Sequence, residues 1–271
     1  MFTTILKIIK GKVYFELMKL RKKESYECNI STKDIVKQIK KNSFVVIPNF
    51  YTDEECAELR KEVDKLILKR EDENNLWTDE SKSDNRCFAA EDNSELIKKF
   101  FENTFLLDVA SSYFGGKIVC SNTLASKINY TEGNIGSGQG WHRDGNNFQF
   151  KAMIYLSDVE IKDGPFQILK GSHKFSNVLK DTITMGTDGI TTRFTNEQVS
   201  KVINKNESNY TVLTAKAGTL VFVDVSSIHT GLPLSKDGQR YALFNYFYPS
   251  YDDIKKRIMK FKNINETREY S

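Results

Sequence analysis

Histidine is scarce in this chain, and two of its three histidines lie in a pattern that could bind a metal. His142 and Asp144 are two positions apart, and residues at that spacing on an extended segment point to the same side. An imidazole and a carboxylate would then face one point, where the distant His229 could complete a facial triad. Such a triad is typical of mononuclear non-haem iron(II), whose open positions would accept a 2-oxo acid and O₂.

Arg240 strengthens this interpretation. It lies eleven residues after His229 (240 − 229 = 11), a spacing at which a returning strand could bring a guanidinium near the metal. Arginine is the side chain best suited to bind a carboxylate through two parallel hydrogen bonds. Taken alone, the H-x-D pattern is weak and Arg240 could be a surface residue, so the hypothesis depends on the combination.

The third histidine, His173, follows a Gly-Ser pair. One interpretation places it near the substrate. We favour the other, a structural histidine that satisfies backbone groups in that turn, because the ligand positions are already filled.

The charge of the chain is concentrated at its start. The formal net charge is +4, and residues 1–23 hold seven basic residues against one acidic residue (7 − 1 = +6). The remainder is therefore slightly acidic (4 − 6 = −2), which argues against nucleic acid as the main partner. With 271 residues and 39% hydrophobic residues, one domain with additions at both ends is the simplest organisation.

The four cysteines are scattered and form no C-x-x-C pair, so we expect neither a disulfide framework nor a zinc knuckle. Lys7 and Lys10 interrupt the first apolar run before a signal peptide could form. No apolar stretch is long enough to span a membrane. A cytoplasmic protein with reduced thiols is the expectation.

Residues 2–20 mix apolar residues with lysines and predict an amphipathic helix. We favour packing of this helix on the domain or on a second copy of the chain. The alternative is a peripheral membrane contact through residues 1–23, with an apolar face and a basic rim. No pattern predicts an oligomeric state.

The pattern changes near residue 117, from helical periodicity to short strands. Thr52 and Glu55 form a capping box before a helical apolar stripe, and Gly115 and Gly116 end a later helical pattern over residues 94–114. Many short strands after a helical block predict a mainly β fold with flanking helices, a double-stranded β-helix of the jelly-roll, cupin-like type. A further helix is expected at residues 32–41 and strands at 44–47, 117–121, 124–130, 150–156, 166–169, 210–214, 219–223, 227–230 and 240–248; residues 71–93 read as loop and 172–209 as unassigned.

An ordered set of motifs resembles the phytanoyl-CoA dioxygenase family of Fe(II)/2-oxoglutarate oxygenases. The matching segments are W-H-R-D at residues 141–144, D-G-P-F-Q-I-L-K-G-S-H-K at 163–174 and A-G-T-L-V-F at 217–222, followed by His229 and Arg240. The resemblance covers about residues 33–249. We therefore expect a basic extension at residues 1–30, a dioxygenase domain at 31–250 and a helical or extended tail at 251–271.

The resemblance implies iron(II) held by His142, Asp144 and His229, and 2-oxoglutarate bound by Arg240, with O₂ as the oxidant. It also implies cofactor-binding positions at Asn129, Lys127 and Tyr155, which could equally be ordinary barrel residues. Two positions depart from the family pattern. Lys170 stands where proline is usual, and Gly231 stands where a hydroxyl side chain often contacts the cofactor, although Thr230 is adjacent.

The expected reaction is hydroxylation of a small polar metabolite with release of succinate and CO₂. Arg143, Trp141 and Asn147 flank the triad and are candidate substrate residues, while Arg86 and Arg193 could meet an anionic substrate. For each of these, a solvated loop residue is the alternative. A lipid- or acyl-linked substrate and a catalytically silent barrel that only binds a ligand are the other functions left open.

Overall fold

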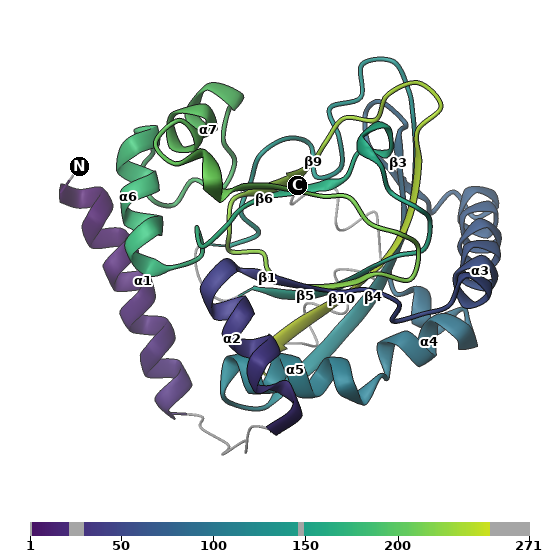
Figure 1. The fold of residues 1–271 in the computed structure, drawn as a ribbon, viewed down its shortest axis with the longest axis horizontal. Coiled ribbons are helices and arrows are strands. Elements are labelled where there is room, and N and C mark those ends of the chain that lie inside the picture. The colour runs from purple at the N-terminus through teal and green to yellow at the C-terminus, as the bar shows by residue number, and fades with distance from the viewer. Residues whose placement is uncertain (1, 22–29, 146–148, 250–271) are drawn as a thin grey trace.

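Two antiparallel β-sheets face each other and form the body of the molecule (Figure 1). The computed structural model describes residues 2–21, 30–145 and 149–249. The large sheet has the order β1 (Phe44–Ile47), β8 (Leu220–Asp224), β5 (Phe150–Tyr155), β10 (Gln239–Pro249), β4 (Ile118–Asn129), β3 (Asp84–Cys87) and β2 (Trp77–Thr78). The small sheet has the order β7 (Tyr210–Leu213), β6 (Phe166–Leu169) and β9 (His229–Gly231). This is the predicted jelly-roll arrangement.

Strand β5 shows how the large sheet separates two environments. Phe150, Ala152 and Ile154 belong to the apolar core on the helical side of the sheet. The alternate residues Lys151 and Met153 line the space between the two sheets. Because side chains alternate along a strand, one face of β5 supports the core and the other supplies side chains to the interior of the barrel.

Helices cover the outer face of the large sheet (Figure 1). The predicted capping box begins one of them, since the Glu55 N–H donates to Thr52 Oγ1 at 3.2 Å and the Thr52 N–H donates to Glu55 Oε2 at 2.8 Å. Gly115 ends another in the left-handed conformation, with φ 73°. These helices are α2 (Lys33–Asn42), α3 (Asp53–Asp72), α4 (Glu95–Phe101) and α5 (Thr104–Phe114); short 3-10 turns lie at Ile30–Thr32, Ala90–Asp92, Ile161–Asp163 and Glu207–Asn209.

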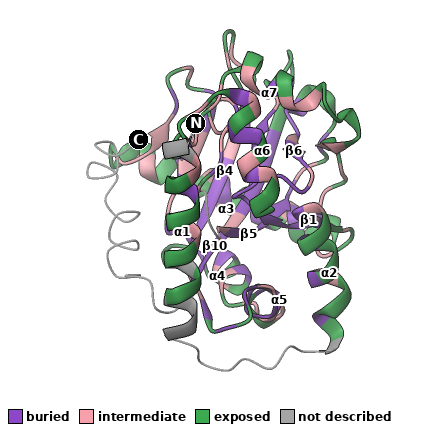
Figure 2. Cartoon of the chain, turned by 90° about the vertical axis from the view of Figure 1, so that its left-hand side faces the viewer, coloured by how far each residue is buried: buried purple, intermediate pink, exposed green. Residues whose placement is uncertain are grey.

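Three further helices lie at the side of the small sheet. Helices α6 (Phe175–Met185) and α7 (Asn196–Ile203) connect β6 to β7, and α1 (Phe2–Arg21) runs beside α6 (Figures 1 and 2). Ile8 of α1 is buried, whereas most of its described side chains are exposed. None of the helices that the structure describes is long and apolar enough to cross a membrane.

The structure differs from the sequence prediction in three segments. Residues 71–93, expected to be loop, contain β2 and β3; β3 has the sequence D-N-R-C and lacks apolar alternation because its inward face is polar. The two strands expected at 117–130 form one strand, β4, whose buried polar middle includes Thr123, hydrogen-bonded to Asn245. The unassigned residues 172–209 contain α6 and α7. The predicted tail at 251–271 lies outside the described residues.

Candidate metal centre

The two segments of the predicted triad meet through a backbone bridge. His142 and Asp144 lie on the loop after β4, and His229 begins β9. The N–H of each histidine donates to the carbonyl of the other, with both N···O distances 2.9 Å. The Asp144 N–H donates to the Val225 carbonyl at 2.9 Å. The backbone therefore brings the three side chains together.

The three side chains converge on one point. Each offers one ligand atom, and these atoms lie within 4.8 Å of one another. Asp144 Oδ1 is 3.3 Å from His142 Nε2 and 3.8 Å from His229 Nε2. Ligands about 2.1 Å from one ion and at right angles to each other lie about 3 Å apart, so the spacing fits a single metal ion.

Both imidazoles are held in the form that binds a metal. His142 Nδ1 lies 2.8 Å from the Gly140 carbonyl, and His229 Nδ1 lies 2.9 Å from the Ser227 carbonyl. A carbonyl only accepts, so Nδ1 carries the proton and Nε2 keeps its lone pair toward the metal position. Burial, followed by the neighbouring His142, lowers the pKa of His229 to about 3. His229 is therefore a neutral donor at neutral pH.

A lysine contacts the second oxygen of the carboxylate ligand. Lys151 of β5 reaches Asp144 Oδ2 and leaves Oδ1 directed to the imidazoles. Burial alone would raise the pKa of Asp144, but Lys151 and the two histidines outweigh it and hold that pKa well below its usual range. Asp144 is thus an ionised carboxylate that could bind a metal. Lys151 was not among the predicted site residues.

The metal group faces a cavity of about 930 Å³ between the two sheets. Ligand cavities are commonly about 300–1,000 Å³, so there is room for a cosubstrate and a small substrate together. Its lining includes the imidazoles of His142 and His229, the charged residues Asp144, Lys151 and Arg240 with Asp79, Glu80, Arg86 and Arg193, and the aromatic residues Trp77, Phe88, Phe166, Phe244, Tyr246 and Tyr248.

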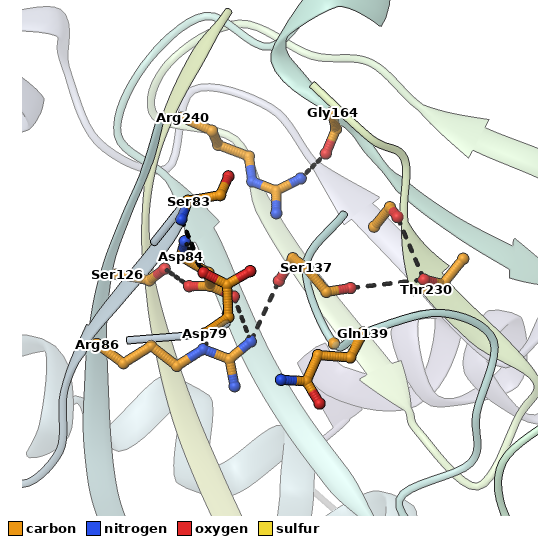
Figure 3. Close-up of polar contacts among 12 residues, drawn as sticks. Asp79, Ser83, Asp84, Arg86, Ser126, Ser137, Gln139, Gly164, Thr230 and Arg240 are labelled. Atoms are coloured by element: carbon orange, nitrogen blue, oxygen red, sulfur yellow. Dashed lines mark hydrogen bonds and ion pairs between the residues drawn. The ribbon is translucent and has the colours of Figure 1, made fainter. Parts of the chain in front are cut away.

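Arg240 reaches into this cavity from the start of β10 (Figure 3). It is only 3% exposed, and its Nη1 donates to the Gly164 carbonyl. Its buried Nε has no hydrogen-bond partner among the residues that the structure describes. Burying an N–H donor without a hydrogen bond costs free energy, so we expect a bound acceptor at this position. A carboxylate is the acceptor that fits a guanidinium best.

The structure places the other predicted cofactor residues away from the cavity surface. Tyr155 is fully buried behind Arg240, where its hydroxyl donates to the Leu213 carbonyl at 3.1 Å. Lys127 lies on the helical side of β4 and donates to Asp64 at 2.8 Å. Asn129 accepts from the exposed Gln239 side chain at 2.7 Å. Tyr155 supports the position of Arg240, whereas nothing brings Lys127 or Asn129 to the metal group.

Two of the predicted substrate residues, Arg143 and Trp141, also point elsewhere. Arg143 is 3% exposed and faces away from the metal, donating to the carbonyls of Ser172 and Ser226. Trp141 packs in an apolar cluster with Ile228. Asn147 lies outside the described residues. Neither Arg143 nor Trp141 lines the cavity. Arg143 lies between two residues that point to the same side, so its own side chain points to the opposite side.

Two arginines expected in loops line the cavity. Arg86 lies on β3, and Arg193 donates to the carbonyls of Gly138 and Gln139 at 3.0 and 3.4 Å. In the sequence, only the charge of each arginine indicated a role at the cavity. The position of Arg86 on a strand had no signal, because β3 lacks the apolar alternation of a strand.

The departure at Gly231 has a structural counterpart. A Cβ at this position would lie 2.8 Å from the Cβ of Ser137, so Ser137 occupies the space that a side chain at 231 would need. The Gly231 N–H donates to the Ser137 carbonyl at 2.9 Å. Ser137 also lines the cavity, so a hydroxyl is present on this wall although residue 231 has none. Thr230 bonds to backbone carbonyls of the same loop.

His173 lies apart from the metal group, as the favoured interpretation requires. Its Nδ1 is 2.9 Å from Ser43 Oγ, which also accepts from the Gly171 N–H at 2.8 Å. His173 therefore ties the turn after β6 to the end of α2.

Gly138 supports His142 directly, and this contact gives a testable prediction. A Cβ at Gly138, whose φ is +83°, would lie 2.4 Å from His142 Cε1. We expect Gly138→Ala to displace the ring and weaken Co(II) binding about 10–100-fold, the usual effect of disturbing a ligand's support. Gly133→Ala is the matched control, because Gly133 has φ +79° and nothing within 4 Å. Equal Co(II) affinity of the two variants, measured by titration, would contradict the prediction.

The fold and the triad are those of jelly-roll oxygenases that use iron and 2-oxoglutarate. Residues 39–242 match the family model described as phytanoyl-CoA dioxygenase. The chain belongs to the phytanoyl-CoA dioxygenase family. The predicted family and fold are thereby confirmed.

Curated relatives are similar at low identity. An ectoine dioxygenase of Stutzerimonas stutzeri is 23% identical over 157 residues, which cover 52% of this chain and 50% of that protein. An ectoine dioxygenase of Bordetella parapertussis is 22% identical over 220 residues, covering 72% of this chain and 68% of that protein. The chain thus spans about half to two thirds of the length of these relatives.

Solved structures share the fold. The epimerase SnoN, in complex with Fe³⁺, alpha ketoglutarate and nogalamycin RO, matches with a TM-score of 0.63 and 17% identity over 81% of this chain and 84% of that chain. EctD from S. alaskensis with bound Fe matches with a TM-score of 0.63 and 15% identity over 83% and 80%. The metal and cosubstrate in these structures agree with the predicted cofactors.

Proposed function

We propose that the chain hydroxylates a small polar metabolite, using iron(II), 2-oxoglutarate and O₂ and releasing succinate and CO₂. One observation supports this most strongly. The convergent ligand atoms of His142, Asp144 and His229 share a cavity with the unpartnered Nε of Arg240. A 2-oxo diacid could chelate a metal at the triad through its 2-oxo group and one carboxylate. Its other carboxylate would then lie at Arg240.

The residues of the chain position and shield the reactants. When bound, iron supplies the activation of O₂ and the oxidation of 2-oxoglutarate to succinate. His142, Asp144 and His229 would hold the ion while leaving coordination positions open. Arg240 would fix the distal carboxylate, and the Tyr155 hydroxyl, which interacts with the guanidinium, would help to hold it in place.

The proposal is tested by adding Fe(II) and 2-oxoglutarate without oxygen and looking for a weak visible charge-transfer band. We expect the band in the wild type. Arg240→Met should weaken 2-oxoglutarate binding by at least about 100-fold, since bonds to charged groups contribute about 1.5–3 kcal/mol each and two would be lost. Lys127→Met, on the other side of the sheet, is the control. A protein that binds the metal and gives no band would contradict the proposal.

A catalytically silent barrel is the competing function. The departures from the family pattern at Lys170 and Gly231 motivate it. Succinate formation that depends on a candidate substrate would exclude it.

The N-terminal helix supports a second proposal, peripheral contact with an anionic membrane, which would favour a lipid- or acyl-linked substrate. Val13 and Leu17 of α1 are 51% and 52% exposed on a helix rich in lysine. We expect Val13→Glu with Leu17→Glu to lower co-sedimentation with phosphatidylserine vesicles. Leu68→Glu, at a residue 61% exposed on α3, is the control. Equal sedimentation of all three proteins would remove the proposal.

A further inference from the structure

Cationic side chains are a prominent feature of the cavity wall. Arg86, Lys151, Arg193 and Arg240 all line it. Under the proposed function, the charges of iron(II) and Arg240 balance those of Asp144 and the dicarboxylate cosubstrate. Of the other cations, Arg86 is paired with Asp84, and Lys151 is paired with Asp144, whose charge a metal would share.

Lys151 lies beside the metal position. Its side chain is 12% exposed, with Nζ at Asp144 Oδ2 and 4.4 Å from the centre of the Tyr246 ring. An ammonium has three N–H donors, and among the described residues Asp144 is its one ionic partner. Once a metal shares the charge of Asp144, Lys151 is a buried cation without a full counter-charge. Such a cation is stabilised by an anion placed next to it.

Arg86 is held as a rigid donor on another wall of the same cavity. Its Nε and Nη2 donate to Asp84 Oδ2 at 3.0 and 2.5 Å, and its Cζ lies 4.7 Å from the centre of the Trp77 ring. Asp84 is itself 2% exposed and accepts from Ser126 at 3.1 Å. Figure 3 shows the guanidinium groups of Arg86 and Arg240 reaching into the same space.

The fixed geometry of Arg86 leaves one edge for a ligand. Its Nη2 also lies 3.4 Å from Ser137 Oγ, whereas Nη1 has no partner among the described residues. A guanidinium fixed by a carboxylate and an aromatic ring loses little freedom when it binds a further acceptor. Burial alone would lower the pKa of Arg86, but Asp84, followed by Tyr246 and Asp144, raises it, so the guanidinium is charged.

We propose that Lys151 and Arg86 bind the carboxylate of an acidic substrate beside the metal. The proposal rests on the proposed function and specifies its substrate class. An acid group at Lys151 would place the neighbouring carbon atoms close to the metal position, so the oxidised C–H bond lies a few bonds from the acid. Phe244, Tyr246 and Tyr248 provide an apolar wall for the remainder of the molecule.

The test uses acids paired with their neutral amides, namely propionate and propionamide, phenylacetate and phenylacetamide, and L-proline and L-prolinamide. Each is titrated calorimetrically into the full chain loaded with Zn(II) and 2-oxoglutarate. We expect at least one acid to bind about ten-fold or more tightly than its amide, the effect of one hydrogen bond to a charged group. Lys151→Met and Arg86→Met should each remove this preference, and Lys151→Arg should restore it. Lys127→Met should leave it unchanged.

Three results would overturn the inference: equal binding of acids and amides, no measurable binding of any acid, or an intact preference in Lys151→Met and Arg86→Met. The charge-transfer band with Fe(II) and 2-oxoglutarate is recorded on the same preparations. Loss of that band contradicts the proposed function itself, whereas a normal band without a preference for acids contradicts only the acidic substrate.

Discussion

Replacing His229 with alanine is expected to remove iron binding and to lower 2-oxoglutarate turnover by more than about 100-fold. Disturbing only the support of a metal ligand already costs 10–100-fold, and this change removes the ligand itself. His229 is 4% exposed and its Nδ1 is committed to the Ser227 carbonyl, so no neighbouring group among the described residues can take its place at the ion.

The measurement is iron content after gel filtration, together with succinate formation. His173→Gln is the matched control, because it changes the one histidine that lies outside the metal group. We expect that variant to keep its iron. A His229→Ala protein that retains stoichiometric iron and turnover would show that the metal lies elsewhere.

Much of the metal centre could be predicted because it depends on local geometry. The H-x-D spacing places two side chains on one side of an extended segment, and this is what the structure shows for His142 and Asp144. The same rule places Arg143 on the opposite side, so its assignment to the substrate was inconsistent with the argument used for its neighbours. Its burial against Ser172 and Ser226 bears this out.

The residues that could not be predicted depend on the strand register. Lys127 and Lys151 each lie within a strand, and one faces α3 whereas the other faces the metal. A shift of one residue exchanges the two faces of a strand, and the sequence does not say which face is inside when both are largely apolar. Arg86 could be predicted as a candidate for an anionic substrate, but its place on a strand could not, since a four-residue polar strand resembles a loop.

The helix ends likewise divide into those that could be predicted from adjacent residues and those that could not. The helix after Thr52 could be predicted from its capping box, and the end of α5 from Gly115, because each depends on a few adjacent residues. The start of α7 carries the same kind of signal, since Thr195 and Gln198 form a capping box. That signal was missed inside a long polar segment, because α7 has only eight residues, of which Val199, Val202 and Ile203 are apolar and only Val199 is buried.

Replacing Arg143 with methionine is expected to destabilise the protein by about 3–5 kcal/mol, the usual effect of removing one partner of a buried ion pair. For a chain of this size, that corresponds to a fall in Tm of roughly 10 °C. Arg143 donates to Asp181 at 3.2 Å, and their side chains are 2% and 12% exposed. Burial lowers the pKa of Arg143 to about 10 and raises that of Asp181 to about 6, so desolvation opposes both charges even while they are paired.

The loss of stability in Arg143→Met should depend on pH because Asp181 titrates. Its pKa in the folded protein is above the value of 3.8 in an unfolded chain, and it should rise further without Arg143, which lowers it. The folded variant therefore takes up a proton more readily than the unfolded chain, and the destabilisation should be largest above pH 6 and shrink as the pH falls toward 4. Denaturant unfolding of the metal-free protein across this range measures it.

Two controls separate the loss of a buried charge from the loss of a salt bridge as such. Arg143→Met with Asp181→Leu removes both charges and should recover part of the stability, because replacing a whole buried pair costs less than breaking it. Lys216→Met breaks a pair with Asp158 whose side chains are 80% and 52% exposed, and should cost less than about 1 kcal/mol. An Arg143→Met variant as stable as Lys216→Met would contradict the role of Arg143 as the buried anchor between the two metal-binding residues that flank it.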